Sequence, residues 1–352
     1  MMSPKPISDD PVVTISQFRH TPLQIIHIFG NFMRIWSVYL MYQYLSQQGA
    51  SVIVFIFSCL LPSCMLFLAL QKPWKGRSLS NQQVIPSVIN GGITALYFIL
   101  WGKGLKSCGP LIAITAEYAG AVLGVLSAAL YGRRGHVWKK VGGLMAMLAS
   151  FYFLSQGWAM SSFSPFSFKD SVETEGHSEQ TVGMKQMMVP IIAGILSALR
   201  RVIARRVSLK NQLKRRLHAL TIASATCFLF PLAIWDMILG SNAESNLKLQ
   251  FPFWTYLSAI VFAFVLIFYI DGIAEEKLHV VFSSPRHLMV AGGCIIVMET
   301  AYKMDFSLLG FLVCALLLGF GIYEATSLDR IGKNIRSPNG GSFEKEDETL
   351  PN

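Results

Sequence analysis

The chain has 352 residues, of which 53% are hydrophobic and only 14% are charged. Because soluble domains carry roughly 25% charged residues, this composition excludes an ordinary soluble protein and indicates a membrane protein. The formal net charge is +10. The basic residues stand in short loops between apolar segments, which favours anionic lipid headgroups over nucleic acid as their partner.

Residues 1–22 form a polar N-terminal tail that includes Asp9 and Asp10. This tail lacks the apolar core of a cleavable signal peptide. We therefore expect the first apolar stretch to serve as an uncleaved signal.

Ten apolar stretches follow the tail, each roughly 17–25 residues long, which is enough to cross a ~30 Å hydrocarbon layer as a helix. They lie near residues 23–45, 51–70, 84–103, 109–131, 141–161, 187–206, 217–239, 253–272, 287–303 and 306–326. The sequence therefore predicts an all-α membrane protein with ten transmembrane helices.

The basic residues predict how these helices are oriented. With both termini on one side, the loops on that side hold 23 of the 30 Lys and Arg residues, the opposite loops hold 6, and Arg34 lies inside the first span. Cytoplasmic loops carry the excess of Lys and Arg. We therefore expect both termini to be cytosolic.

The longest connection, residues 162–186, is a hydrophilic linker between two five-helix halves, 23–161 and 187–326, and we expect it to be lumenal. Since five is odd, the halves would be inverted in the membrane, as in many secondary carriers that bind cargo between their repeats. The linker holds several acids but only His177, and we interpret it as a solvated loop and not a metal site. Residues 327–352 form a polar C-terminal tail.

The ionisable residues within the predicted spans that we single out are Arg34, Glu117 and Glu299. Charges at membrane depth are costly and usually face protein or water, so each is a candidate functional residue. We expect them to meet in one cavity with Arg34 as the counter-ion. An ion pair that only fixes helix register is an equally weighted alternative.

Other polar residues in the spans are expected to have ordinary roles. Asp236, Asp271 and Glu324 lie near span ends, where headgroups and water would satisfy them. His27 and Asn31 are four residues apart on one helix face and predict a hydrogen-bonded pair.

Gly120 and Gly124 have the GxxxG spacing that allows two helices to approach closely in lipid. We favour packing within this bundle over a dimer contact. The six cysteines form no CxxC pair and are interpreted as small apolar fillers.

A strongly basic segment connects the sixth and seventh spans, with eight positive charges between Arg200 and Arg216. We predict a helical extension that lies along the anionic headgroups as a cytosolic anchor, the alternative being ordinary positive-inside residues without such a helix. The predicted anchor residues are Arg205, Arg206, Lys210, Lys214, Arg215 and Arg216.

Known catalytic motifs are missing from the sequence. It has no GxSxG elbow, no Walker loop and no HExxH. We therefore predict that the chain is not an enzyme, with no resident metal and no cofactor.

Three segments resemble the ten-helix drug/metabolite transporter superfamily, whose halves end in a charged hairpin followed by a Gly-led helix. Residues 133–153 and 303–323 are similar to these endings, and residues 190–206 are similar to the opening helix of a second half. This resemblance implies an independent carrier of a small organic anion or nucleotide sugar.

A narrower resemblance rests on four segments. They are Gln71-Lys72-Pro73, Leu100-Trp101-x-x-Gly104-Leu105-x-x-Cys108-Gly109-Pro110-Leu111 with Glu117, Arg216-Leu-His-Ala219-Leu220 and Phe268-Tyr269-Ile-Asp271. They resemble the N-terminal extension of the Golgi and early-secretory zinc transporters, the metal tolerance protein branch of the cation diffusion facilitator family. The resemblance implies a role in zinc transport into the secretory pathway and a Golgi or other early-secretory membrane.

The zinc-carrying domain of that family binds its cargo through HxxxD pairs, and no histidine here has Asp four residues later. The resemblance therefore implies an accessory, assembly or targeting module, with zinc only as the cargo of the parent family. Its partner would be a cation diffusion facilitator subunit or a downstream carrier domain. A central cavity lined by Arg34 and Glu117 would favour the independent carrier, whereas a solid bundle would favour the accessory module.

Overall fold

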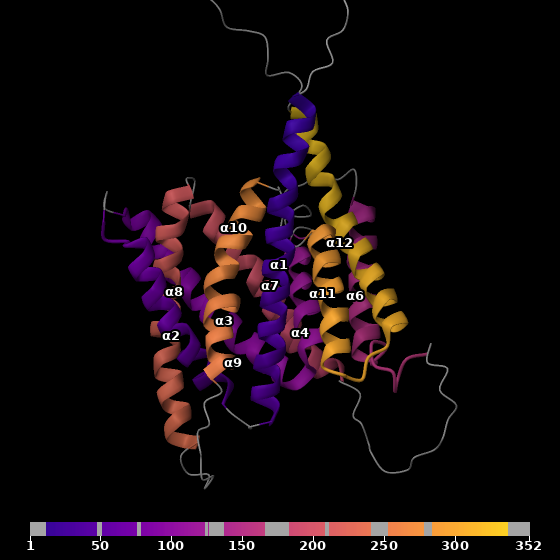
Figure 1. Ribbon diagram of the computed structural model, residues 1–352, viewed down its shortest axis with the longest axis horizontal. Helices are drawn as coiled ribbons and strands as arrows, with labels where there is room; N and C mark the ends of the chain where they lie inside the picture. The colour runs from indigo at the N-terminus through magenta and orange to yellow at the C-terminus, as the bar shows by residue number, and fades with distance from the viewer. Residues whose placement is uncertain are drawn as a thin grey trace, which may run out of the picture.

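The computed structural model describes residues 12–47, 51–75, 79–123, 126, 137–165, 183–207, 211–240, 253–277 and 284–336. Within these ranges the regular elements are helices and no strand occurs (Figure 1). In chain order they are α1 (Val12–Gln47), α2 (Val52–Gln71), α3 (Asn81–Cys108), α4 (Pro110–Ala116), η1 (Glu117–Ala121), α6 (Val137–Ser155), α7 (Met184–Val207), α8 (Asn211–Gly240), α9 (Phe253–Ser258), η3 (Ala259–Leu266), α10 (Ile267–Lys277), α11 (Pro285–Ala301) and α12 (Leu308–Arg336).

Six helical segments among the described residues are long and apolar enough, by length and composition, to cross a membrane. They are Val52–Gln71, Asn81–Cys108, Met184–Val207, Lys214–Leu239, Phe253–Gly272 and Leu308–Ala325. The chain is therefore an all-α, multi-pass membrane protein.

Helices overlap each of the ten apolar stretches, but several boundaries differ from the prediction. Helix α1 begins at Val12 and α12 continues to Arg336, within segments expected to be polar tails. Helix α6 ends at Ser155, before the expected position 161. The backbone of Gly157 has φ +80°, a left-handed conformation that suits glycine and turns the chain away from the helix.

Two of the predicted spans are irregular helices. The fourth changes at Glu117 from the α-helix α4 to the tighter 3₁₀ helix η1. The eighth passes through the π-helix η3 between α9 and α10. Such interruptions are frequent at functional sites, and both lie beside the cavity described below.

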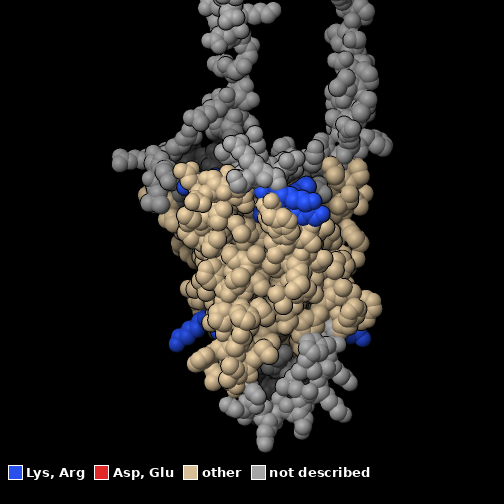
Figure 2. Space-filling model, turned by 90° about the vertical axis from the view of Figure 1, so that its left-hand side faces the viewer, with Lys and Arg blue, Asp and Glu red and all other residues tan. Residues whose placement is uncertain are grey.

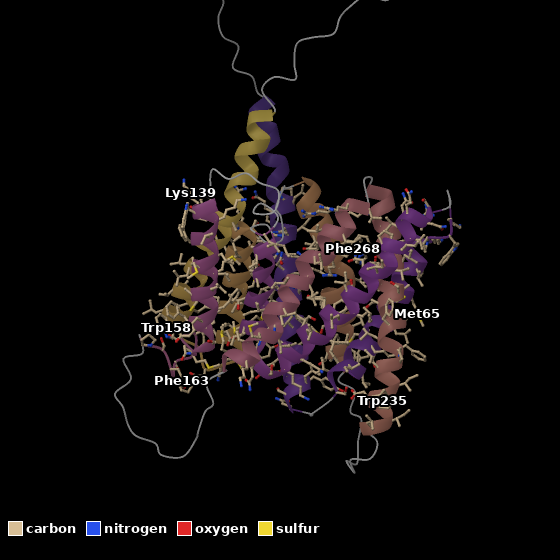
Figure 3. All side chains as sticks on the ribbon, turned by 180° about the vertical axis from the view of Figure 1, so that it is seen from behind. Met65, Lys139, Trp158, Phe163, Trp235 and Phe268 are labelled. Atoms are coloured by element: carbon tan, nitrogen blue, oxygen red, sulfur yellow. The ribbon has the colours of Figure 1, made fainter. Side chains whose placement is uncertain are left out.

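The two ends of the bundle differ in composition. Helix α1 begins and α12 ends at the same end (Figure 1). Lys and Arg form a cluster at this end, the basic end, and a few also lie at the opposite end, below a broad band without charged residues (Figure 2). Lys139 lies at this basic end, whereas Trp158, Phe163 and Trp235 lie at the opposite, aromatic end (Figure 3). Aromatic residues of this kind are enriched where a helix meets the membrane interface.

Small residues allow close contact between helices. A Cβ added at Gly321 of α12 would lie 2.7 Å from the carbonyl oxygen of Gly143 in α6. A Cβ at Gly120 of η1 would lie 2.9 Å from the carbonyl oxygen of Gly194 in α7. Gly120 thus packs within the chain, whereas Gly124 lies outside the described residues.

Candidate functional site

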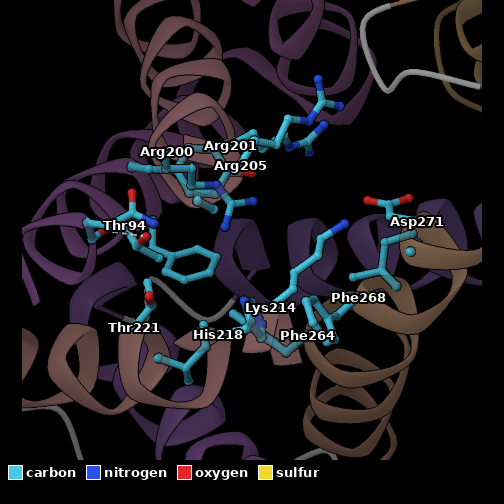
Figure 4. A pocket seen from close by; sticks show the side chains of 18 of the residues that line it. Thr94, Arg200, Arg201, Arg205, Lys214, His218, Thr221, Phe264, Phe268 and Asp271 are labelled. Carbon is cyan, nitrogen blue, oxygen red and sulfur yellow. Dashed lines mark hydrogen bonds between the residues drawn. The ribbon is translucent and has the colours of Figure 1, made fainter. Parts of the chain in front are cut away.

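A cavity of about 180 Å³ lies between α1, α3, α7, α8, the η3–α10 segment and α11 (Figure 4). Its walls combine basic, aromatic and neutral polar side chains. The lining residues are His27, Arg34, Asn90, Thr94, Tyr97, Phe98, Arg200, Arg201, Ala204, Arg205, Lys214, His218, Thr221, Ile222, Ala263, Phe264, Ile267, Phe268, Asp271, Gly272 and His287.

Five permanently basic side chains converge on this cavity. Arg200, Arg201 and Arg205 come from the last turns of α7, and Lys214 extends from the first turn of α8 between them and Asp271 (Figure 4). The fifth is Arg34 of α1. Positive charges in a cleft with apolar walls concentrate anions there.

Aromatic side chains of the wall contact the basic ones. The guanidinium carbon of Arg200 lies 4.6 Å from the ring centre of Tyr97, a cation–π contact. The rings of His218 and Phe268 stack at 3.8 Å with an interplanar angle of 6°. These contacts hold the side chains in place around the cavity.

Several lining residues carry buried polar atoms that have no hydrogen-bond partner among the described residues. They include Oδ1 of Asn90, Nε of Arg200 and Nε2 of His218. Asn90 is only 4% exposed. A buried polar atom that lacks a partner is costly, so a ligand or water in the cavity is the natural partner for the Asn90 amide.

Arg34 and Glu117, two of the three predicted intramembrane charges, form a salt bridge. The side chain of Arg34 is 12% exposed and that of Glu117 is 1% exposed. The hydroxyl of Tyr97 donates to Glu117 Oε1 at 3.3 Å. Arg34 therefore lines the cavity, and Glu117, which does not line it, forms the salt bridge that positions Arg34.

Glu299, the third predicted charge, is buried elsewhere. It accepts a hydrogen bond from the hydroxyl of Tyr39 at 2.6 Å, and the Tyr39 ring stacks on Tyr302 at 5.5 Å. Glu299 is not among the residues that line the cavity. The structure thus brings together Arg34 and Glu117 but not Glu299.

The predicted basic anchor divides into different environments. Helix α7 is described as far as Val207 and α8 from Asn211, and Lys210 lies outside the described residues. Arg205 and Lys214 line the cavity.

The remaining residues of the anchor do not line the cavity. Arg206 and Arg215 are exposed. Arg216 instead donates to the carbonyl oxygen of Pro73 at 2.5 Å. The segment therefore supplies cavity residues as well as surface charge.

Asp271 was expected at the membrane interface and instead lines the cavity. It is the one carboxylate among the lining residues that the structure describes. Asp236, in contrast, accepts a hydrogen bond from the Ser51 hydroxyl. Glu324 is half-buried near Gly143.

Most of the neutral lining residues were not predicted, although the sequence carries a signal for them. Three helices each place lining residues at spacings of four and then three. These sets are Asn90, Thr94 and Tyr97 in α3, Lys214, His218 and Thr221 in α8, and Phe264, Phe268 and Asp271 in the η3–α10 segment. This spacing keeps each set on one helix face.

Asp305 connects the segment before α12 with the residues that follow α6, outside the membrane-spanning segments. Its carboxylate accepts hydrogen bonds from the hydroxyl and backbone N–H groups of Ser161 and Ser162, including one of 2.5 Å from Ser162 Oγ. Burial disfavours the charged carboxylate, but these hydrogen bonds outweigh it and lower the pKa of Asp305. No cluster of three or more metal-ligating side chains occurs within the described part of the chain.

Comparisons with known proteins add little to this geometry. No protein-family model and no curated protein matches the chain. One solved structure, described only as "Crystal structure of protein", aligns with 16% sequence identity and a TM-score of 0.48, covering 87% of this chain and 98% of the other. The cavity is therefore the basis for a functional assignment.

Proposed function

We propose that this chain is a membrane carrier that binds a small organic anion in the cavity. The convergence of Arg34, Arg200, Arg201, Arg205 and Lys214 on one cavity carries this proposal. Charges in a low-dielectric cavity select strongly for cargo of the opposite sign. Aromatic and amide side chains beside them suit an anion that also has an organic part.

The proposal includes ten membrane-spanning helices with both termini in the cytosol. Arg205 and Lys214, at adjoining ends of α7 and α8, place the cavity mouth at the basic end. By the positive-inside rule that end faces the cytosol. The cavity would therefore receive cargo from the cytosol.

Helix packing supports an inverted repeat of two five-helix halves. Helix α1 contacts α10 and η3, and the matching helix α7 contacts α3. Helix α1 also contacts α11, while α7 contacts η1. The contacts of α2 with α8 and of α6 with α12 join matching helices directly. This pattern is what a two-fold relation between halves would produce, with the cavity between them.

The accessory role in a Golgi zinc transporter, implied by resemblance, stays a prediction. The cavity lined by Arg34, with Glu117 behind it, favours the independent carrier, because a module that only supports a partner has no need of a cationic cavity. Organic anion and nucleotide sugar remain the two cargo classes, and both bring negative charge to the basic side chains.

Binding to the purified full chain in lipid nanodiscs tests the proposal. We expect sulfate, inorganic phosphate, citrate and a nucleoside monophosphate to raise the unfolding temperature, with no rise from glucose or choline at the same ionic strength. Lys214→Ala and Arg205→Ala should each weaken the binding of the effective anions by about tenfold, which corresponds to about 1.4 kcal/mol.

Neighbouring basic residues supply matched controls. Arg206→Ala and Arg215→Ala remove the same charge from exposed positions that do not line the cavity, and should change binding by less than about twofold. Equal losses in cavity and control variants would show a diffuse electrostatic effect. That result, or the lack of stabilisation by every anion, would overturn the proposal.

A further inference from the structure

Two histidines face each other in the wall of the cavity. His27 of α1 and His287 of α11 both line it, and their ring centres are 5.5 Å apart in an edge-to-face arrangement. They are 6% and 2% exposed, respectively. Histidine is the side chain whose charge changes most readily near neutral pH, so such a pair at a cargo cavity can bind a proton together with the cargo.

Hydrogen bonds fix both rings. The hydroxyl of Tyr118 in η1 lies 2.5 Å from His287 Nδ1. The amide nitrogen of Asn31 lies 3.1 Å from His27 Nε2 and 2.9 Å from the His27 carbonyl oxygen. An amide nitrogen only donates, so His27 Nε2 is the accepting, unprotonated nitrogen. The ring of His27 is therefore neutral in this arrangement and retains a site for a proton.

The charges around the pair come from several helices. Arg34 of α1 and Arg201 of α7 act on His287, and Asp271 of α10 acts on His27. From η1, Tyr118 bonds to His287, and Glu117 bonds to Arg34. Burial of both rings, and the positive charge beside them, oppose a further positive charge while the cavity lacks cargo.

An anion among the basic side chains would reverse this balance. Its negative charge would offset Arg34 and Arg201, so that a proton on the histidine pair costs less free energy. Binding of the anion and of the proton then strengthen each other, and by linkage the effect is the same in both directions.

We propose that the cavity binds its anion together with a proton held by His27 and His287, which makes the chain a proton–anion symporter. This inference rests on the proposed function. It assigns the histidine pair as the proton-binding group. Asp271, whose charge interacts with Arg201, Arg34 and His27, is the alternative that the double variant below tests. A proton gradient could then drive accumulation of the anion.

Sulfate is the probe for this inference, because its charge does not change across the range in which histidine titrates. Its binding to the full chain in nanodiscs would be measured by calorimetry in two buffers that differ in ionisation enthalpy. We expect proton uptake that reaches at most about one proton per sulfate between about pH 5 and 7. As the pH rises through that range, the affinity should fall by up to about tenfold per pH unit.

Variants identify the group that takes up the proton. His27→Gln with His287→Gln should abolish both the proton uptake and the pH dependence of sulfate affinity. His218→Gln, which alters another lining histidine on α8, should keep both, whatever its effect on the affinity itself.

The outcomes separate this inference from the function on which it rests. Sulfate binding without proton uptake by the wild-type chain would overturn the symporter and leave the anion carrier standing. Persistent pH dependence in the double variant would overturn the assignment to His27 and His287. If neither sulfate nor another anion binds, the proposed function itself fails, and the symporter with it. The measurement of proton uptake by the wild-type chain tests the symporter even if the double variant does not fold.

Discussion

The basic and aromatic ends of the bundle are built from the same helices but packed in different ways. At the basic end α1 presents His27 and Arg34 to a cavity. Toward the aromatic end the side chains of the same helix are tightly packed, since Tyr39 and Leu45 are each 1% exposed. There the hydroxyls of Tyr44 and Tyr256 lie 3.3 Å apart, and Phe55 packs 4.9 Å from the Tyr256 ring.

This difference indicates that tight packing at the aromatic end is replaced by a binding cavity at the basic end. Aromatic side chains fill the aromatic end and pair their hydroxyls, which makes a seal of low polarity. At the basic end, like charges are held near one another around a cavity, an arrangement that disfavours the empty state. Arrangements that cost stability are typical of sites that await a ligand, and each prediction below tests one side of this contrast.

The largest expected effect comes from the salt bridge beneath the cavity. Arg34→Met should destabilise the folded chain by about 3–5 kcal/mol, because it leaves the buried Glu117 carboxylate without its counter-ion. Titration with a denaturing detergent would measure this loss. Arg34→Met combined with Glu117→Gln should recover most of it, and a single variant as stable as the wild type would contradict the role of the pair.

A smaller loss is expected where α6 crosses α12. Gly143→Ala should cost about 1–3 kcal/mol, since overpacking a tight contact forces backbones apart. The new Cβ would lie 2.9 Å from the Gly321 carbonyl oxygen, whereas a Cβ at the adjacent Gly142 meets nothing within 4 Å. Gly142→Ala in the same detergent titration is therefore the control. Equal stability of the two variants would show that this contact is looser than described.

At the cavity, removal of the lining carboxylate should favour anions. Asp271→Asn should tighten sulfate binding by roughly three- to tenfold, the equivalent of about 0.7–1.4 kcal/mol, because one repulsive charge is lost. Calorimetry would measure the affinity at a fixed pH. Asp236→Asn, whose carboxylate bonds to Ser51 and does not line the cavity, should leave the affinity unchanged. Weaker binding by Asp271→Asn would mean that Asp271 holds part of the cargo.

The smallest effect concerns Asp305 at the aromatic end. Because its pKa is lowered in the folded chain, its contribution to stability is complete above the ordinary Asp value of about 3.9 and is lost as pH falls through the lowered value. Asp305→Asn should therefore reduce the acid sensitivity of unfolding in that range. Identical pH profiles for the variant and the wild type would show that the hydrogen bonds from Ser161 and Ser162 add nothing.

The helices could be predicted from the sequence because length and hydropathy are local properties. The ends of the helices were harder to predict, because they depend on single residues such as Gly157, whose left-handed backbone follows the end of α6. The change to a 3₁₀ helix at Glu117 has no pattern in the sequence, because it arises where η1 packs on α7.

The candidate site was predictable only in part. Arg34 and Glu117 could be identified because charged residues are costly within a membrane. Which carboxylate pairs with Arg34 could not be identified, because that depends on the packing of helices that are far apart in sequence. Glu299 was grouped with them wrongly, because it stands 14 residues after the start of α11, a rise of ~21 Å. Asn90 and His218 follow a helical spacing, yet spacing alone does not say which face meets the cavity.

The most direct test of the anion site is an experimental structure of the chain bound to selenate, a tetrahedral dianion that scatters anomalously. We predict an anomalous peak inside the cavity, within hydrogen-bond distance of Arg201 or Lys214. A peak confined to the exposed Arg206 and Arg215, or an empty cavity at a selenate concentration that stabilises the chain, would contradict this account.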